Sequence, residues 1–115
     1  MSADQQPRSI NQCRDVQDVL VQIRLRPSMW IPQRSLRDLQ NILIGYATAL
    51  SVHGVDERFA LSPDGPFAEW LRARYGWSMA LGWAEAIDRN AGDEEPLTAF
   101  FRLLDEYRSA CDPHG

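Results

Sequence analysis

Four side chains in this chain are of the types that bind soft metals or act as nucleophiles, and they are widely spaced. They are Cys13, His53, Cys111 and His114. A structural zinc site uses pairs of ligands a few residues apart, such as C-x-x-C and H-x-x-x-H, and neither pattern occurs. We therefore expect no metal site and no cofactor. The two cysteines are expected to be unpaired small hydrophobic residues, although they could form a disulfide if the chain ends meet.

Carboxylates and histidine are the next candidates for catalysis, because a titrating side chain can act as a general acid or base. Glu69, Glu85 and Glu106 lie on predicted helices beside solvent-facing Arg or Ala residues, which is typical of surface charges. His53 is expected at a helix C-terminus, where a partly charged imidazole is favourable. All twelve basic residues are Arg, so the chain has no lysine base and no P-loop lysine. The sequence predicts that the protein is not an enzyme.

Acidic residues are concentrated in the last third of the chain. Residues 85–115 contain three Arg and eight acids, whereas residues 1–84 contain nine Arg and eight acids. Inhibitors of nucleases present carboxylates to a basic cleft, where complementary charge accelerates association. The candidate partner-binding residues are Asp88, Asp93, Glu94, Glu95, Asp105 and Glu106. The competing interpretation is that these acids are ordinary solvated charges at a helix start and on a helix face.

Nucleic-acid binding is the other function that charge can suggest. Residues 19–37 contain four Arg and no acid, and two predicted helices flank this window. However, the connector between them is too long for a helix-turn-helix and contains two prolines. The net charge of −4 also opposes attraction to phosphate. We therefore do not expect a nucleic-acid partner.

Hydrophobic periodicity predicts an all-α fold with about five helices. Apolar residues recur at spacings of three and four, and no segment alternates as a strand does. Ser35 is a predicted N-cap, Gly76 a predicted stop, and Pro96 lies in a predicted first turn. Ser78 is expected to cap another helix. The predicted helices span residues 11–25, 35–53, 67–75, 78–90 and 93–111.

Two local features predict how these helices pack. Pro27 and Pro32 should hold the connector between the first two helices rigid, with Trp30 as its buried anchor. Gly45 interrupts the second helix, and we expect it to allow close approach of another helix. The residues expected to be largely buried are Trp30, Leu39, Leu43, Trp70, Trp83, Phe100 and Leu104.

Length and composition predict one compact domain. The chain has 115 residues with 44% hydrophobic and 24% charged content, as soluble globular proteins do. We expect a disordered lead-in over residues 1–10, a helical domain over 11–111 and a flexible tail over 112–115. The polar N-terminus does not look like a signal peptide, and no apolar run approaches the ~20 residues of a membrane span. A cytoplasmic location follows as the expectation.

A hydrophobic pattern extends over most of the chain. It reads I-x-x-R-P-x-M-[aromatic], S-L-x-x-L-x-x-h-h-x-G-Y, F-x-x-W-L, G-W-x-x-x-I and F-F-x-L-L-D-E-[aromatic]-R, where h is apolar. These segments occupy residues 23–30, 35–46, 67–71, 82–87 and 100–108. The pattern resembles small helical bacterial proteins that look like immunity proteins, the partners of contact-dependent and other polymorphic toxins. The resemblance implies a shared fold and assigns no functional residue.

The leading hypothesis is therefore a small cytoplasmic binding protein that inhibits a cognate partner, as an immunity protein neutralises a bacterial toxin domain. The partner would be a protein, such as a basic toxin domain, and not a membrane. The alternative is a homodimeric regulatory or scaffold protein without catalytic activity, which exposed apolar residues on the helix over residues 78–90 would favour.

Overall fold

The structure is a computed structural model that describes residues 15–55, 57, 59–63 and 65–111, with side chains up to Ala110. Within these residues it contains six helices and no strand, so the all-α prediction is confirmed. The chain divides into two compact units, Met1–Arg34 and Ser35–Gly115, which are described separately. The predicted lead-in and tail, and the question of whether Cys13 and Cys111 are close, lie outside the described part of the chain.

The first unit contains α1 (Val16–Leu25) and the short helix α2 (Pro27–Trp30), which contact each other. Asp15 is the N-cap of α1, because its backbone is extended and its Oδ1 accepts a hydrogen bond from the Asp18 backbone N–H at 3.1 Å. The helix thus begins at Val16 rather than at the predicted Asn11. Its apolar face, Val16, Val19, Leu20 and Ile23, is buried as the periodicity predicts.

The connector after α1 differs from its prediction in two respects. Pro27 occupies the first position of α2, where a missing N–H costs no helical hydrogen bond. This proline therefore starts a helical turn instead of only ending α1. The expected anchor, Trp30, is only half-buried and Met29 is 70% exposed, whereas Ile31 is fully buried. The prediction of a buried Trp30 is wrong, and the buried apolar side chain of the connector is Ile31.

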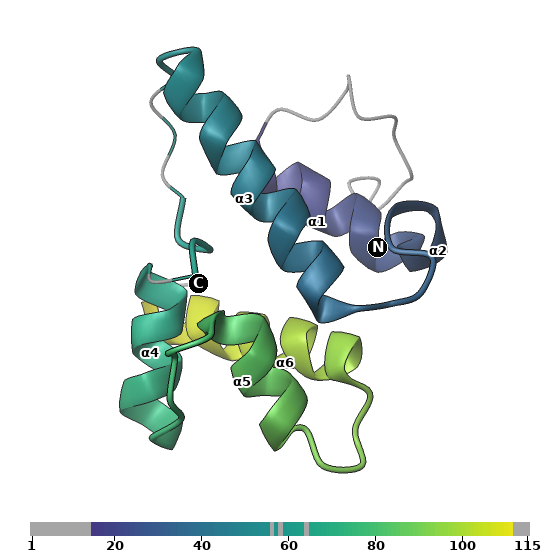
Figure 1. Ribbon diagram of the computed structural model, residues 1–115, viewed down its shortest axis with the longest axis vertical. Helices are drawn as coiled ribbons and strands as arrows, with labels where there is room; N and C mark the ends of the chain where they lie inside the picture. Colours follow the sequence, from purple (N-terminus) through teal and green to yellow (C-terminus); the bar gives the residue numbers. More distant parts are fainter. Residues whose placement is uncertain (1–14, 56, 58, 64, 112–115) are drawn as a thin grey trace. The chain divides into compact units, whose positions relative to one another are not determined.

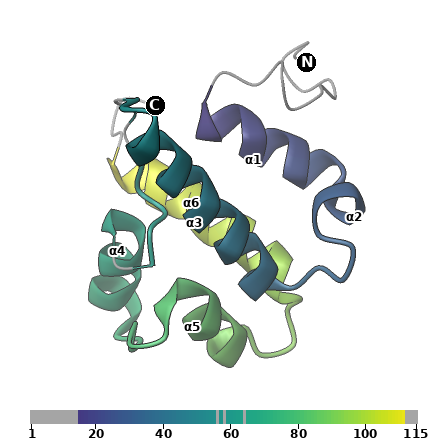
Figure 2. The same ribbon diagram turned by 45° about the horizontal axis from the view of Figure 1, so that its top comes forward.

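The second unit contains α3 (Leu36–Val52), α4 (Pro66–Tyr75), α5 (Gly82–Asn90) and α6 (Pro96–Cys111). Ser35 caps α3 through its Oγ, and Gly76 ends α4 in the left-handed conformation, both as predicted. Helix α5 contacts α3, α4 and α6, and α4 also contacts α6 (Figures 1 and 2). The predicted helix from Ser78 is four residues too long, since residues 78–81 form a turn in which Ser78 Oγ accepts from the Ala80 N–H.

An aromatic cluster forms the core of this unit. Phe67, Trp83 and Phe100 are fully buried, and the Phe67 ring packs edge-to-face with each of the other two at 5.9 Å between centroids. The Trp83 indole N–H donates to the Leu61 carbonyl at 2.9 Å, which fastens the long connector before α4 to the core. Leu39, Leu43 and Leu104 are buried as predicted. Trp70 is only half-buried, contrary to the prediction.

The expected role of Gly45 is also wrong. A Cβ atom added at this position would have nothing within 4 Å, and the residue is exposed. No other described helix of the second unit therefore approaches Gly45 closely.

Candidate functional site

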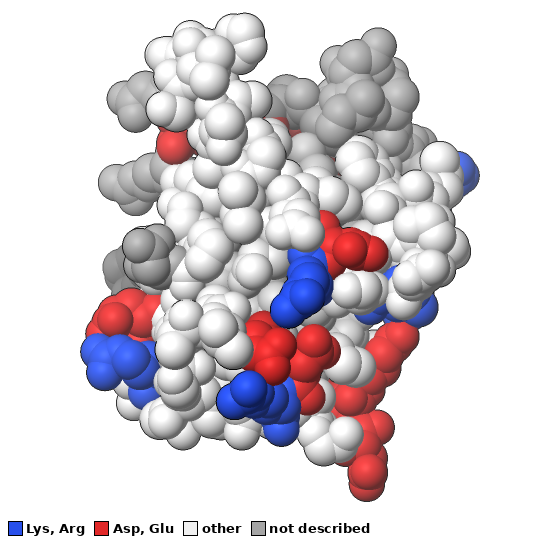
Figure 3. All heavy atoms as spheres, in the orientation of Figure 1, with Lys and Arg blue, Asp and Glu red and all other residues white. Residues whose placement is uncertain are grey.

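The six candidate acids occupy the end of α5, the turn that follows it, and α6. Asp88 lies in the last turn of α5, Asp93 and Glu95 lie in the turn, and all three are exposed. Asp105 is exposed on α6, whereas Glu94 and Glu106 are half-buried. Figure 3 shows acidic side chains along the lower right edge of the molecule, where Figure 1 places the turn between α5 and α6.

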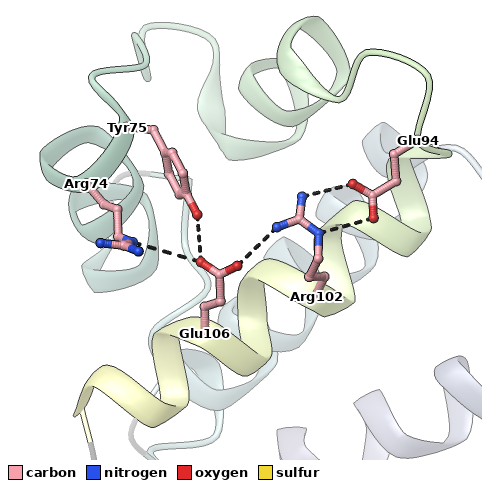
Figure 4. A network of polar contacts seen from close by, with 5 residues as sticks. All are labelled: Arg74, Tyr75, Glu94, Arg102 and Glu106. Carbon is pink, nitrogen blue, oxygen red and sulfur yellow. Dashed lines mark hydrogen bonds and ion pairs between the residues drawn. The ribbon is translucent and has the colours of Figure 1, made fainter.

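Two of these acids are bound by one arginine of the same chain. The Arg102 guanidinium donates two hydrogen bonds to Glu94, from Nε at 3.2 Å and from Nη2 at 2.9 Å (Figure 4). Its third nitrogen donates to Glu106 Oε2 at 3.1 Å, one helical turn further along α6. Arg102 therefore links the turn before α6 to the middle of that helix, and its single positive charge offsets part of the charge of two carboxylates that the sequence suggested for a partner.

Glu106 is held from a second direction by the end of α4. The Tyr75 hydroxyl donates to Glu106 Oε1 at 2.6 Å, and Arg74 Nε lies 3.9 Å from the same oxygen (Figure 4). Periodicity along one helix could have suggested the Arg102–Glu106 pair, which has i,i+4 spacing. It could not have suggested the contact with Tyr75, because that residue lies on another helix.

The environments of Glu94 and Asp88 shift their pKa values in opposite directions. The hydrogen bonds from Arg102 lower the pKa of Glu94, because they stabilise its charged form. Partial desolvation and the nearby charge of Glu85 raise the pKa of Asp88, although Arg37 acts in the opposite sense. Glu94 is thus bound as a firmly ionised group, and Asp88 is the acid that would gain more from a cationic partner.

The other ionisable residues considered from the sequence form surface contacts. Glu69 pairs with Arg72 and Glu85 pairs with Arg89, each within one helix. His53 ends α3 and is exposed, as expected from its position. No group of three or more His, Cys, Asp or Glu residues that could hold a metal ion occurs within the described ranges.

A half-open groove of about 340 Å³ lies between α5 and the connector that precedes it. Trp77 and Leu81 form its apolar side, and Arg89 and Asn90 line it from the last turn of α5. The Trp77 ring stacks on Tyr75 at 4.7 Å between centroids, and Leu81 is 65% exposed. This groove was not predicted from the sequence, because residues 78–81 were expected to be helical.

No helix among the described residues is long and apolar enough to cross a membrane. Comparisons with protein-family models, with curated proteins and with solved structures find no match for this chain.

Proposed function

We propose that this protein binds and inhibits a cognate protein partner, in the manner of an immunity protein that neutralises a bacterial toxin domain. The observation that supports this most directly is the combination of groups at the last turn of α5. Asp88 is exposed there and Asp93 and Glu95 follow in the turn, while Arg89 and Asn90 of the same helix end line the groove.

These groups suit two kinds of contact with a basic protein. Exposed carboxylates attract a positively charged surface and accelerate its association. A groove with an exposed Leu81 and a stacked Trp77 can receive an apolar side chain of the partner, as the central residues of protein interfaces do. The acidic contact surface of this proposal consists of the exposed acids Asp88, Asp93, Glu95 and Asp105, since Glu94 and Glu106 are half-buried.

The alternative, a homodimeric regulator, was expected to show exposed apolar residues on the helix over residues 78–90. In α5 the large apolar side chains Trp83 and Ile87 are fully buried. Leu81, which lies in the predicted range just before α5, is 65% exposed, so this range gives the alternative one large exposed apolar side chain.

The test is co-expression with toxic domains encoded next to this chain, followed by binding kinetics with the purified domain. We expect protection of the cells and rapid association that slows as salt rises, because the screening length falls from ~10 Å at 0.1 M to ~3 Å at 1 M. Asp93→Arg and Glu95→Arg, made as separate single variants, should each associate more slowly. Glu69→Arg, a charge reversal at an exposed residue of α4, is the matched control and should bind like wild type.

Two results would count against the proposal. One is the absence of protection by this chain against any neighbouring toxic domain. The other is a complex whose association rate responds equally to reversal at Glu69 and at the turn residues, since that would show only a net-charge effect.

A further inference from the structure

The groove between α5 and the connector that precedes it has an apolar side and a charged side. Trp77, Ala80 and Leu81 of the connector form the apolar side, and Glu85 and Arg89 line the groove from α5. Its volume of about 340 Å³ is at the small end of the roughly 300–1,000 Å³ typical of ligand pockets. A half-open groove of this size suits one long side chain of a partner better than a cofactor.

The Glu85 carboxylate has an oxygen that a ligand could use. Its Oε2 accepts a hydrogen bond from Arg89 Nε at 2.8 Å. Among the residues that the structure describes, no donor reaches the other oxygen, Oε1. The side chain of Glu85 is 32% exposed, so part of its hydration is already lost. A second cation could bind Oε1 without displacing Arg89.

The Trp77 indole offers a ring face to the same guest. Tyr75 stacks on the indole at 4.7 Å between centroids, with 18° between the ring planes, so it covers one of the two faces. Within the described ranges no other ring or cation stacks on Trp77. Cations bind to such faces, and arginine does so more often than lysine because its guanidinium is planar.

The charge around the groove favours a cationic guest over an anionic one. Residues 85–95 contain five acids and one Arg, and this residue, Arg89, is bound to Glu85. Asp88 is exposed at a spacing of three from Glu85, so the two carboxylates are neighbours on α5. Desolvation and the charge of Glu85 raise the pKa of Asp88, as expected for carboxylates that repel each other. A cation would relieve this repulsion, and an anion would increase it.

We propose that this groove binds an arginine side chain of the partner. The apolar stem of an arginine can pack along Leu81 while its charged end reaches Glu85 and Trp77. The guanidinium suits both neighbours, since it can donate to Glu85 Oε1 and stack on the indole at the same time. A purely apolar side chain would cover Oε1 without giving it a donor, which costs free energy. Arginine is also enriched among the residues that dominate binding at protein interfaces.

The choice of arginine rests on the proposed function, because it names the side chain that a basic partner would insert. The two can nevertheless fail separately. Small arginine derivatives test the groove without any toxic domain, whereas protection of cells tests the inhibition. Arginine binding without protection would leave the groove and remove the toxin. Protection without arginine binding would do the reverse.

The experiment is a titration of the full chain with N-acetyl-arginine methylamide, followed by NMR of the backbone and indole N–H groups at constant ionic strength. We expect saturable shifts centred on Trp77, Leu81 and Glu85, with millimolar affinity. N-acetyl-citrulline methylamide has a similar shape without the charge, and it should bind at least about threefold more weakly. The corresponding lysine derivative should also bind more weakly, because an ammonium neither stacks nor binds a carboxylate through two parallel hydrogen bonds.

Two variants locate the site, and a third is the control. Glu85→Gln should weaken arginine binding at least about threefold, because it removes the charge and keeps the size. Trp77→Leu should weaken binding by removing the ring face. Glu69→Gln is the matched control, since Glu69 is an exposed carboxylate that likewise pairs with an arginine of its own helix. It should bind the arginine derivative like wild type.

Each other outcome overturns the proposal. Equal binding of the citrulline and arginine derivatives would show that charge plays no part, and equal binding of lysine would remove the preference for a guanidinium. Shifts that do not saturate, or that centre on Asp93 and Glu95, would show only nonspecific attraction to the acidic turn. Unchanged arginine binding in Glu85→Gln would remove the carboxylate from the site. The comparisons between ligands use the wild-type chain, so they decide the matter even if a variant does not fold.

Discussion

The side chain of Gln40 in α3 holds the first turn of α5, since its Oε1 accepts a hydrogen bond from the Ala84 backbone N–H at 3.2 Å. Helix α5 follows Leu81, whose side chain provides no cap. Gln40 thus performs from another helix the task of an N-cap residue, which is to satisfy a free N–H of the first turn. Gly82 makes room for it, because a Cβ at that position would lie 2.6 Å from the Gln40 oxygen.

We expect Gln40→Ala to lower the free energy of unfolding by about 0.5–2 kcal/mol, the range measured for lost helix caps. Gly82→Ala should also destabilise, since its φ of 88° costs an L-residue about 1–2 kcal/mol and the new methyl displaces Gln40. Urea denaturation measures both. The double variant should lose less than the sum, because the same hydrogen bond is lost once. If the two losses of unfolding free energy simply added, the capping role of Gln40 would be contradicted. Gln33→Ala, at an exposed turn residue, is the control and should not change stability.

Phe100 is expected to be the most costly single truncation tested in the core. Its ring is fully buried and stacks on Trp83 at 4.9 Å between centroids. Phe100→Ala should cost about 3–5 kcal/mol, which is a large share of the ~5–15 kcal/mol that stabilises a typical domain. Thermal unfolding measures the effect. Leu81→Ala removes an exposed apolar side chain and should change stability by no more than about 0.5 kcal/mol. Equal midpoints for the two variants would contradict this account of the core.

Those parts of the fold that depend on near neighbours in sequence could be predicted. The apolar faces of α1 and α6, the Ser35 cap and the Gly76 stop all follow from spacing or from backbone preferences of single residues. The start of α5 could not be predicted in this way. Ser78 looks like a cap, but its hydroxyl binds Ala80 two residues on, and the real cap is Gln40 on another helix.

The candidate site was predictable to a similar extent. The concentration of acids after residue 85 identified the turn between α5 and α6, and the structure exposes Asp93 and Glu95 there. The sequence could not show that Glu94 is held by Arg102 eight residues away, because the chain must turn from the loop into α6 to bring them together. The groove beside Trp77 depends on residues 78–81 leaving the helix, which is again a tertiary effect.

Gly45→Ala should stabilise the monomer by about 0.4–1 kcal/mol. The position is helical and has open space for a methyl group, so the substitution only reduces the entropy of the unfolded chain and improves helix propensity. Urea denaturation measures this effect. Gly82→Ala is the natural contrast, because its positive φ predicts the opposite sign. A destabilised Gly45→Ala monomer would show that another part of the chain packs on this glycine.

The Arg102 network should appear in the acid titration of Glu94. The pKa of Glu94 lies below the ordinary 4.5 because Arg102 binds the charged form. The Glu94 carboxylate therefore contributes stability above pH 4.5, and this stability is lost as the pH falls through the folded pKa. Carboxyl chemical shifts followed by NMR measure this midpoint directly. In Arg102→Gln the Glu94 midpoint should rise towards 4.5.

Asp88 is the internal control for that titration, since its raised pKa comes chiefly from desolvation and Glu85 and should change little in Arg102→Gln. The effect of Asp88 on stability has the opposite sign to that of Glu94. Because its folded pKa lies above the unfolded 3.8, stability falls as the pH rises from 3.8 through the folded pKa, and ionised Asp88 opposes folding above that range. Asp88→Asn should therefore not lower stability at neutral pH. If the Glu94 midpoint were the same with and without Arg102, the bidentate pair would not exist in solution.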